Sequence, residues 1–300
     1  MLLRQESEIK RFEFISKNRH NYRVAKLCKV LKVSRSGYYA WEKRPISQRK
    51  KDTAKLIVQI KAIHRKSRFS SGSRKITQAL RRDRIVNHKR VERICKQENI
   101  RSKTAKKFKA TTNSKHNLPV AENKLNRQFT ADKPNQKLVS DITYVWTEEG
   151  WLYVAAIMDL YGQKIVGLAM SSRMTKELVI QALKNTYNRY GTSPGCILHS
   201  DRGSQYCSNE YQELLKKHGY NCSMSRKGNC WDNAPMEAFW GKLKYEWLND
   251  FDFKTRAEAK SAVFEYVEIF YNRQRLHAAN NYLTPDEYYF GSKKISNLKK

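Results

Sequence analysis

HSDRGSQY (His199–Tyr206) and GNCWDNAPMEAFWGKLKYE (Gly228–Glu246) are the two sequence stretches that decide the fold of this chain. In the first, Asp201 follows a short apolar run and precedes a glycine, which predicts a buried strand that ends in a turn at this carboxylate. In the second, a Gly-Asn loop signal and a proline precede Glu237, which predicts that this residue lies in the first turn of a helix. Functional side chains are often presented where regular elements meet loops. Both carboxylates are therefore candidate functional groups.

A third carboxylate, Asp141, lies in KLVSDITYV (Lys137–Val145). The alternation in this strand-like run directs the Asp141 side chain to an otherwise apolar or β-branched face, with Val139, Thr143 and Val145. Three converging carboxylates repel one another unless they are protonated or bridged by a cation. Oxygen ligands suit Mg²⁺ or Mn²⁺, and two such ions about 3.5–4 Å apart serve phosphodiester displacement. Spacing alone does not establish such a site, because the chain has 28 acidic residues.

The order of several motifs resembles one known family. SDITY, HSDRGSQY and GNCWDNAPMEAFWGKLKYE, with 35 residues between Asp201 and Glu237, are similar to the DDE core of retroviral-integrase-like transposases. The chain most resembles the larger (orfB) product of the IS-three family of insertion sequences. That resemblance extends over most of the chain, through GYYAW (Gly37–Trp41), DLYGQKIVG (Asp159–Gly167), YNRQRLH (Tyr271–His277) and LTPDEY (Leu283–Tyr288).

This resemblance implies an α/β protein with an RNase H-like mixed sheet flanked by helices, the integrase catalytic core. It implies a transposase that cleaves and joins DNA strands, with water attacking first and a freed 3′-hydroxyl next. Asp141 would bridge two Mg²⁺ (or Mn²⁺) ions, Asp201 would hold one and Glu237 the other. An RNase H-fold nuclease is the nearest alternative, since hydrolysis and strand transfer differ in the nucleophile. A non-catalytic DNA-binding regulator is a second alternative, against which the presence of all three carboxylates argues.

The charge of the chain is concentrated in its first half. The net charge is +32, and residues 1–133 hold 38 lysines and arginines against 10 acidic residues. Such a segment favours a polyanionic partner, and DNA fits better than a membrane because no apolar run is long enough to span a bilayer. The amino terminus lacks a signal-peptide apolar region, so we expect a cytoplasmic, nucleoid-associated protein.

Composition and periodicity predict five segments. These are a helical segment with a helix-turn-helix (1–45), a helix-turn-helix-like DNA-binding domain (52–100), a basic linker (101–133), the catalytic core (134–250), and a C-terminal helix and tail (251–300). The linker is rich in lysine and shows little periodicity, so we expect it to become ordered only against DNA. In the core, we expect three antiparallel strands, then alternating helices and strands, the mixed sheet of an α/β domain.

Candidate DNA contacts fall on helices of both halves. On the helix expected from Asn87 to Glu98, Lys89, Arg90 and Arg93 lie opposite the apolar positions and can meet phosphate. The alternatives are a solvated charged face here and a merely packed helical hairpin in residues 24–41. Lys244 follows Glu237 by two helical turns and either holds a phosphate near the metals or is a solvated lysine. Arg273 and Arg275 either bind the DNA backbone or serve the surface.

The six cysteines form no Cys-x-x-Cys pair, so we expect free thiols and no structural zinc. By the resemblance, we expect a homo-oligomer on DNA. The chain shows no sustained heptads. The resemblance also implies that the upstream orfA product usually supplies a terminal-repeat-binding helix-turn-helix and a coiled coil, so we expect that product as a partner, either separate or fused to this chain by a frameshift.

Overall fold

The computed structural model describes residues 7–103 and 119–291, with the side chain of Cys230 excepted. By its internal contacts the chain divides into two compact units, Met1–Val58 and Gln59–Lys300. The middle of the predicted basic linker, residues 104–118, lies outside the described residues. Each unit has its own architecture, and the second contains all three candidate carboxylates.

The first unit begins with three short helices, α1 (Glu8–Asn18), α2 (Val24–Leu31) and α3 (Arg35–Lys43). They enclose a small core of Phe12, Ile15, Cys28, Leu31 and Tyr38. The hydroxyl of Ser34 accepts the backbone N–H of Gly37 at 3.1 Å and caps α3. The two helices expected in residues 24–41 are therefore present. Tyr38, the first tyrosine of GYYAW, is fully buried.

The next three helices are α4 (Gln48–Lys66), which runs from the first unit into the second, α5 (Ser73–Leu80) and α6 (His88–Gln97). Asn87 caps α6 because its side chain accepts the backbone N–H of Lys89 at 2.9 Å. One face of α6 is buried through Val91, Ile94 and Cys95. The amphipathic helix expected from Asn87 to Glu98 is therefore present as α6.

The core sheet has five strands in the order β3-β2-β1-β4-β5. They are β1 (Lys137–Val145), β2 (Leu152–Asp159), β3 (Lys164–Ser171), β4 (Ile197–Ser200) and β5 (Asn221–Met224). The first three form the expected antiparallel meander, and β1–β4 and β4–β5 pair in parallel. The sheet is thus mixed, as predicted.

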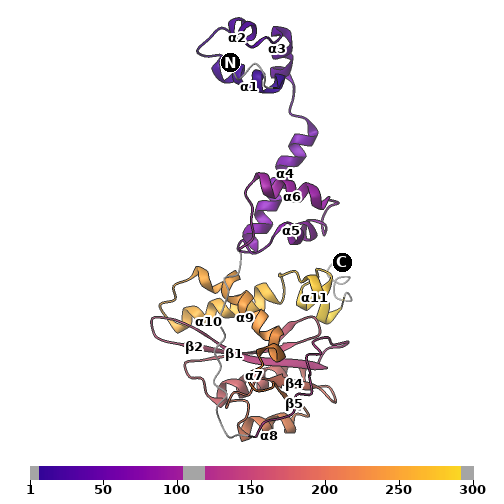
Figure 1. Ribbon diagram of the computed structural model, residues 1–300, viewed down its shortest axis with the longest axis vertical. Helices are drawn as coiled ribbons and strands as arrows, with labels where there is room; N and C mark the ends of the chain where they lie inside the picture. Colours follow the sequence, from indigo (N-terminus) through magenta and orange to yellow (C-terminus); the bar gives the residue numbers. More distant parts are fainter. Residues whose placement is uncertain (1–6, 104–118, 292–300) are drawn as a thin grey trace. The chain divides into compact units, whose positions relative to one another are not determined.

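Helices cover both faces of this sheet (Figure 1). One face packs against α9 (Ala234–Glu246), α10 (Arg256–Phe264) and the π-helical turn η4 (Glu265–Tyr271). The other packs against α7 (Lys176–Tyr190) and α8 (Asn209–Lys217). Val139 belongs to the first cluster and Leu138 to the second, which confirms the alternation expected in β1. Asp141 therefore shares the face that α9 covers.

Residues 119–133, the described end of the predicted linker, are packed on the core, whereas we expected them to become ordered only against DNA. Leu125 is 1% exposed and its backbone N–H donates to the Ser223 hydroxyl at 3.1 Å. Arg127 donates to the buried carboxylate of Asp232 at 2.8 Å. Burial of one leucine and one ion pair orders residues that composition alone assigned to a linker.

The C-terminal residues complete the core. The expected C-terminal helix is present as α10, which continues without a break into η4, where Tyr266, Val267, Phe270 and Tyr271 are all buried. The last described helix is α11 (Pro285–Phe290), and its Tyr289 joins the second core cluster. Residues 251–291 are therefore part of the packed domain.

No helix among the described residues is long and apolar enough to cross a bilayer. The cysteines whose side chains are described are free thiols: Cys28, Cys95, Cys196, Cys207 and Cys222.

Candidate active site

Strand pairing brings Asp141 and Asp201 to neighbouring positions. β1 and β4 pair in parallel with Leu138 opposite Leu198 and Val139 opposite His199. Two steps further along the same register, Asp141 comes opposite Asp201, just after β4 ends. Neighbouring strands lie about 4.8 Å apart. The two carboxylates, 60 residues apart in sequence, therefore stand side by side where β4 gives way to a loop.

Asp141 is held between the sheet and α9. The indole N–H of Trp240 donates to Asp141 Oδ2 at 3.1 Å. Burial raises the pKa of Asp141 well above its usual range, the negative charge of Asp201 adds to this, and that of Glu237 adds less. The indole hydrogen bond acts in the opposite direction. A bound cation or a proton would relieve the repulsion between these two carboxylates.

The loop after β4 orients Asp201. The backbone N–H of Gly203 donates to Asp201 Oδ1 at 2.9 Å. A Cβ atom at Gly203 would lie only 3.1 Å from the same oxygen and 3.0 Å from the side-chain oxygen of Gln205. Glycine at this position therefore permits the close approach of backbone and carboxylate.

Glu237 lies in the first turn of α9, as predicted. Trp240, which contacts Asp141, follows it by one helical turn, so Glu237 faces the same edge of the sheet. Glu237 is exposed, and partial desolvation by its surroundings raises its pKa. The amide of Asn233 donates to the Ser140 carbonyl at 3.0 Å and ties the start of α9 to β1.

The charges of Asp201 and Glu237 both raise the pKa of Asp141, but the three carboxylates do not form a compact cluster. Within residues 7–103 and 119–291, no three His, Cys, Asp or Glu side chains are grouped closely enough to hold a metal ion. The charge of Asp201 raises the pKa of Asp141 more than the charge of Glu237 does.

Asp232 has a role that the sequence did not reveal. No side-chain hydrogen bond caps the start of α9. Instead the buried Asp232 carboxylate accepts two bonds from the Arg226 side chain, at 2.9 and 2.7 Å, and one from Arg127. These arginines hold the pKa of Asp232 well below its usual range. Asp232 thereby fixes the loop that leads into α9.

Lys244 lies beside the candidate carboxylates. Its ammonium is 5.2 Å from the centre of the Tyr144 ring. Burial lowers the pKa of Lys244, and the negative charge of Asp141 opposes that shift. Lys244 is therefore positioned, as expected, two turns beyond Glu237 and within electrostatic reach of Asp141.

The other candidate DNA residues separate into two groups. Lys89 and Arg93 are exposed on α6, and Arg90 is partly exposed there. Arg273 is exposed and 3.7 Å from Asp286. Arg275 is only 7% exposed and donates to both carboxylate oxygens of Glu246 at 2.7 and 2.6 Å. The expected DNA contact at Arg275 is therefore wrong, because its guanidinium is hydrogen-bonded to Glu246 inside the core.

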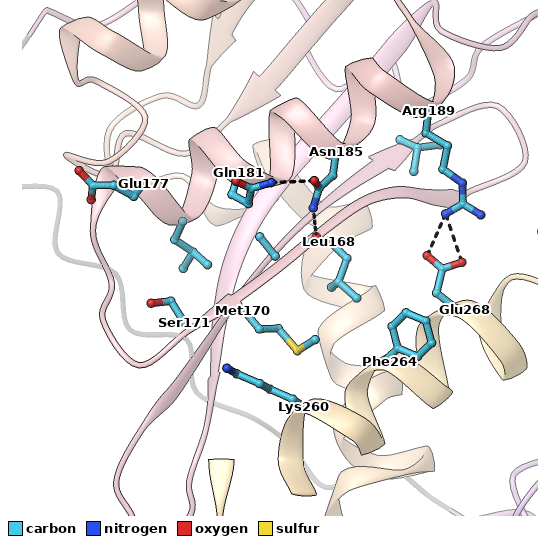
Figure 2. A pocket seen from close by; sticks show the side chains of 13 residues that line it. Leu168, Met170, Ser171, Glu177, Gln181, Asn185, Arg189, Lys260, Phe264 and Glu268 are labelled. Carbon is cyan, nitrogen blue, oxygen red and sulfur yellow. Dashed lines mark hydrogen bonds and ion pairs between the residues drawn. The ribbon is translucent and has the colours of Figure 1, made fainter. Parts of the chain in front are cut away.

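Among the cavities of the described core, two differ in what lines them. One of about 640 Å³ lies along the edge strand β3 between α7 and α10 (Figure 2). Arg189 pairs with Glu268 at its rim, and Asn185 donates to the Leu168 carbonyl. None of the three candidate carboxylates lines it. The other, of about 930 Å³, is lined by Tyr144, Trp146 and Lys244 and so adjoins the candidate site.

Comparison with known proteins points to one family. Two models, each described as Integrase core domain, match residues 131–230 and 218–285, and the HTH-like domain model matches residues 51–108. The insertion element IS600 uncharacterized 31 kDa protein of Shigella sonnei is 48% identical over 260 residues, covering 86% of this chain and 96% of that protein. The transposase InsF for insertion sequence IS3A of Escherichia coli (strain K12) is 38% identical over 281 residues, covering 93% of this chain and 98% of that protein.

Solved structures are similar at lower identity. The simian T-cell lymphotropic virus intasome in complex with PP2A regulatory subunit B56 gamma contains a chain 15% identical to this one, with a TM-score of 0.46 and coverage of 74% and 72%. The HTLV-2 integrase catalytic core domain in complex with magnesium is also 15% identical, with a TM-score of 0.41 and coverage of 53% and 98%.

Proposed function

The chain belongs to the family of IS3-type insertion-sequence transposases, and from this premise we propose that Asp141, Asp201 and Glu237 carry its DNA cleavage and strand transfer. Action in DNA transposition and an integrase-type polynucleotidyl transferase core follow from membership. The assignment of the chemistry to these three residues rests chiefly on the β1–β4 register, which brings Asp141 beside Asp201. α9 then adds Glu237 from the same face.

We infer that the three carboxylates bind two Mg²⁺ or Mn²⁺ ions. The donor set is oxygen only, which favours hard cations. The pKa of Asp141 is raised by burial and by the charge of Asp201, so a bound cation would relieve a repulsion that the folded chain contains. When bound, such ions polarise the phosphate and activate the attacking oxygen.

The side chains around the carboxylates have supporting tasks in this proposal. Trp240 fixes one oxygen of Asp141, and the Gly203 N–H fixes one oxygen of Asp201. Lys244 binds a phosphate of the DNA strand next to the reacting one, because its ammonium lies within electrostatic reach of Asp141. The attacking group is water in cleavage and a 3′-hydroxyl in joining.

The deciding experiment compares Asp141→Asn with Asp132→Asn, a matched change at an exposed carboxylate outside the site. Purified variants receive a duplex with a free 3′-hydroxyl end and a target duplex. We expect Asp141→Asn to bind DNA but to lose metal-dependent nicking and joining by orders of magnitude. Asp132→Asn should be active. Unchanged joining by Asp141→Asn would refute the assignment, and nicked product without joined product in the wild type would favour the nuclease.

The helical segments supply DNA binding in this proposal. The HTH-like match over residues 51–108 supports placing Lys89, Arg90 and Arg93 of α6 at the DNA. We propose that the working form is a homo-oligomer, together with the upstream orfA product or as a fusion with it. Sedimentation of the chain on DNA carrying the ends of its own element, with and without that product, tests both proposals. Finding a single copy of the chain on each pair of DNA ends would contradict the homo-oligomer.

A further inference from the structure

Three aromatic side chains are exposed together beside the candidate site. They flank the hairpin turn between β1 and β2, and Tyr144 is 37% exposed, Trp146 59% and Trp151 41%. The Trp151 ring centre lies 4.9 Å from that of Tyr144 and 4.8 Å from that of Trp146, both edge to face. Cross-strand ring contacts of this kind stabilise a hairpin. Stabilising the hairpin does not by itself require Trp146 and Trp151 to be this exposed.

The turn that carries the rings is held rigidly. Buried Thr147 donates from its hydroxyl to the Gly150 carbonyl at 2.7 Å, and the Gly150 N–H returns a bond to the Thr147 carbonyl at 2.9 Å. Gly150 has φ +102°, which side-chain-bearing residues rarely adopt. Arg256 of α10 donates to the Trp151 carbonyl at 3.0 Å. A preformed surface loses little entropy when a flat ligand binds it.

Lys244 connects the ring surface with the candidate active site. Its ammonium lies 5.2 Å from the centre of the Tyr144 ring, and the charge of Asp141 acts on it. Tyr144 itself lies on the face of β1 opposite to that of Asp141. Tyr144, Trp146 and Lys244 line one cavity of about 930 Å³, together with Lys103, Glu148, Asp250 and Asp252. Aromatic faces beside an ammonium group are the combination that binds a nucleobase together with its phosphate.

We propose that Tyr144, Trp146 and Trp151 form a stacking surface for a nucleobase displaced from the end of the DNA duplex, next to the phosphate held by Lys244. The inference rests on the proposed function, because it places the DNA end at Asp141, Asp201 and Glu237. The Lys244 ammonium beside the Tyr144 ring favours a nucleobase with its phosphate over a protein partner. A strand end separated from its complement leaves one base without a stacking partner, and the exposed rings can supply one.

The test uses the full chain without divalent metal and two duplexes, one fully paired and one ending in a single unpaired 2-aminopurine. Stacking on the rings should quench 2-aminopurine fluorescence in the wild type. We expect Trp146→Ala combined with Trp151→Ala to abolish the quenching and weaken binding of the unpaired-end duplex by about 5- to 150-fold, since stacking stabilises each base to that extent. Binding of the paired duplex should be unchanged. Trp146→Phe, which keeps a ring, should retain the quenching.

Phe264→Ala is the matched control, because Phe264 is 53% exposed but lines the other cavity (Figure 2). Equal weakening for both duplexes, or retained quenching in the double variant, would overturn the inference. Loss of self-association with unchanged quenching would do so too and would indicate a protein-docking surface. Asp141→Asn should quench like the wild type while failing to join strands. Failure of the stacking surface is thereby separable from failure of the catalytic assignment.

Discussion

Replacing Trp240 with phenylalanine would isolate one contact of the candidate site. The indole N–H donates to Asp141 Oδ2 at 3.1 Å, and the ring is 6% exposed in the core. Phenylalanine keeps most of the buried apolar surface and removes only the donor. A hydrogen bond to a charged group contributes about 1.5–3 kcal/mol, which corresponds to about 10- to 150-fold in an equilibrium constant. We therefore expect the Mg²⁺ concentration for half-maximal joining to rise by at least about 10-fold.

The assay is the rate of strand joining titrated with Mg²⁺, with DNA affinity and unfolding temperature measured alongside. Trp247→Phe is a matched control: its indole is 5% exposed, and the indole N–H has no hydrogen-bond partner among the described residues. That variant removes a similar volume but no bond, so its Mg²⁺ dependence should match the wild type. An equal shift in both variants, or none in Trp240→Phe, would refute the view that the indole orients Asp141 for metal binding.

Three further predictions concern stability and DNA binding. Arg275→Met leaves Glu246 buried without its partner and should lower the free energy of unfolding by about 3–5 kcal/mol in urea titrations, whereas Arg273→Met, at an exposed site, should change it by less than about 0.5 kcal/mol. Because arginine partners lower the pKa of Asp232, its stabilisation is present above about pH 4 and is lost as the pH falls through the lowered value; the difference in unfolding free energy between wild type and Asp232→Asn should shrink in that acid range. Lys244→Ala should reduce the salt dependence of DNA binding by about one phosphate contact, and an undiminished slope would remove Lys244 from the interface.

Local patterns were sufficient to predict the elements that bear the candidate carboxylates. The period-two alternation in β1 placed Asp141 on the face with Val139, and that face is the one that α9 covers. The loop signal and proline before Glu237 placed it in the first turn of α9. These signals are readable because a strand or helix period involves residues only two to four positions apart.

Contacts between distant segments could not be predicted in the same way. The hydrogen bond from Trp240 to Asp141 joins residues 99 positions apart, and the sequence around either residue does not predict it. Arg275 looks like a surface arginine in YNRQRLH, yet its partner Glu246 makes it part of the core. The packing of Leu125 on the sheet was hidden by the lysine-rich composition around it.

The sequence by itself determined which side chains are available for the chemistry, which elements present them, and the basic character of the amino-terminal half. Only the tertiary structure decided that the offset of 60 residues between β1 and β4 matches the offset between Asp141 and Asp201, so that the two carboxylates meet. It also decided that Asp232 and Arg275 serve the fold. The physical reason is that strand register and buried ion pairs depend on which segments meet in space, whereas the periodicity of a strand or helix depends only on neighbours along the chain.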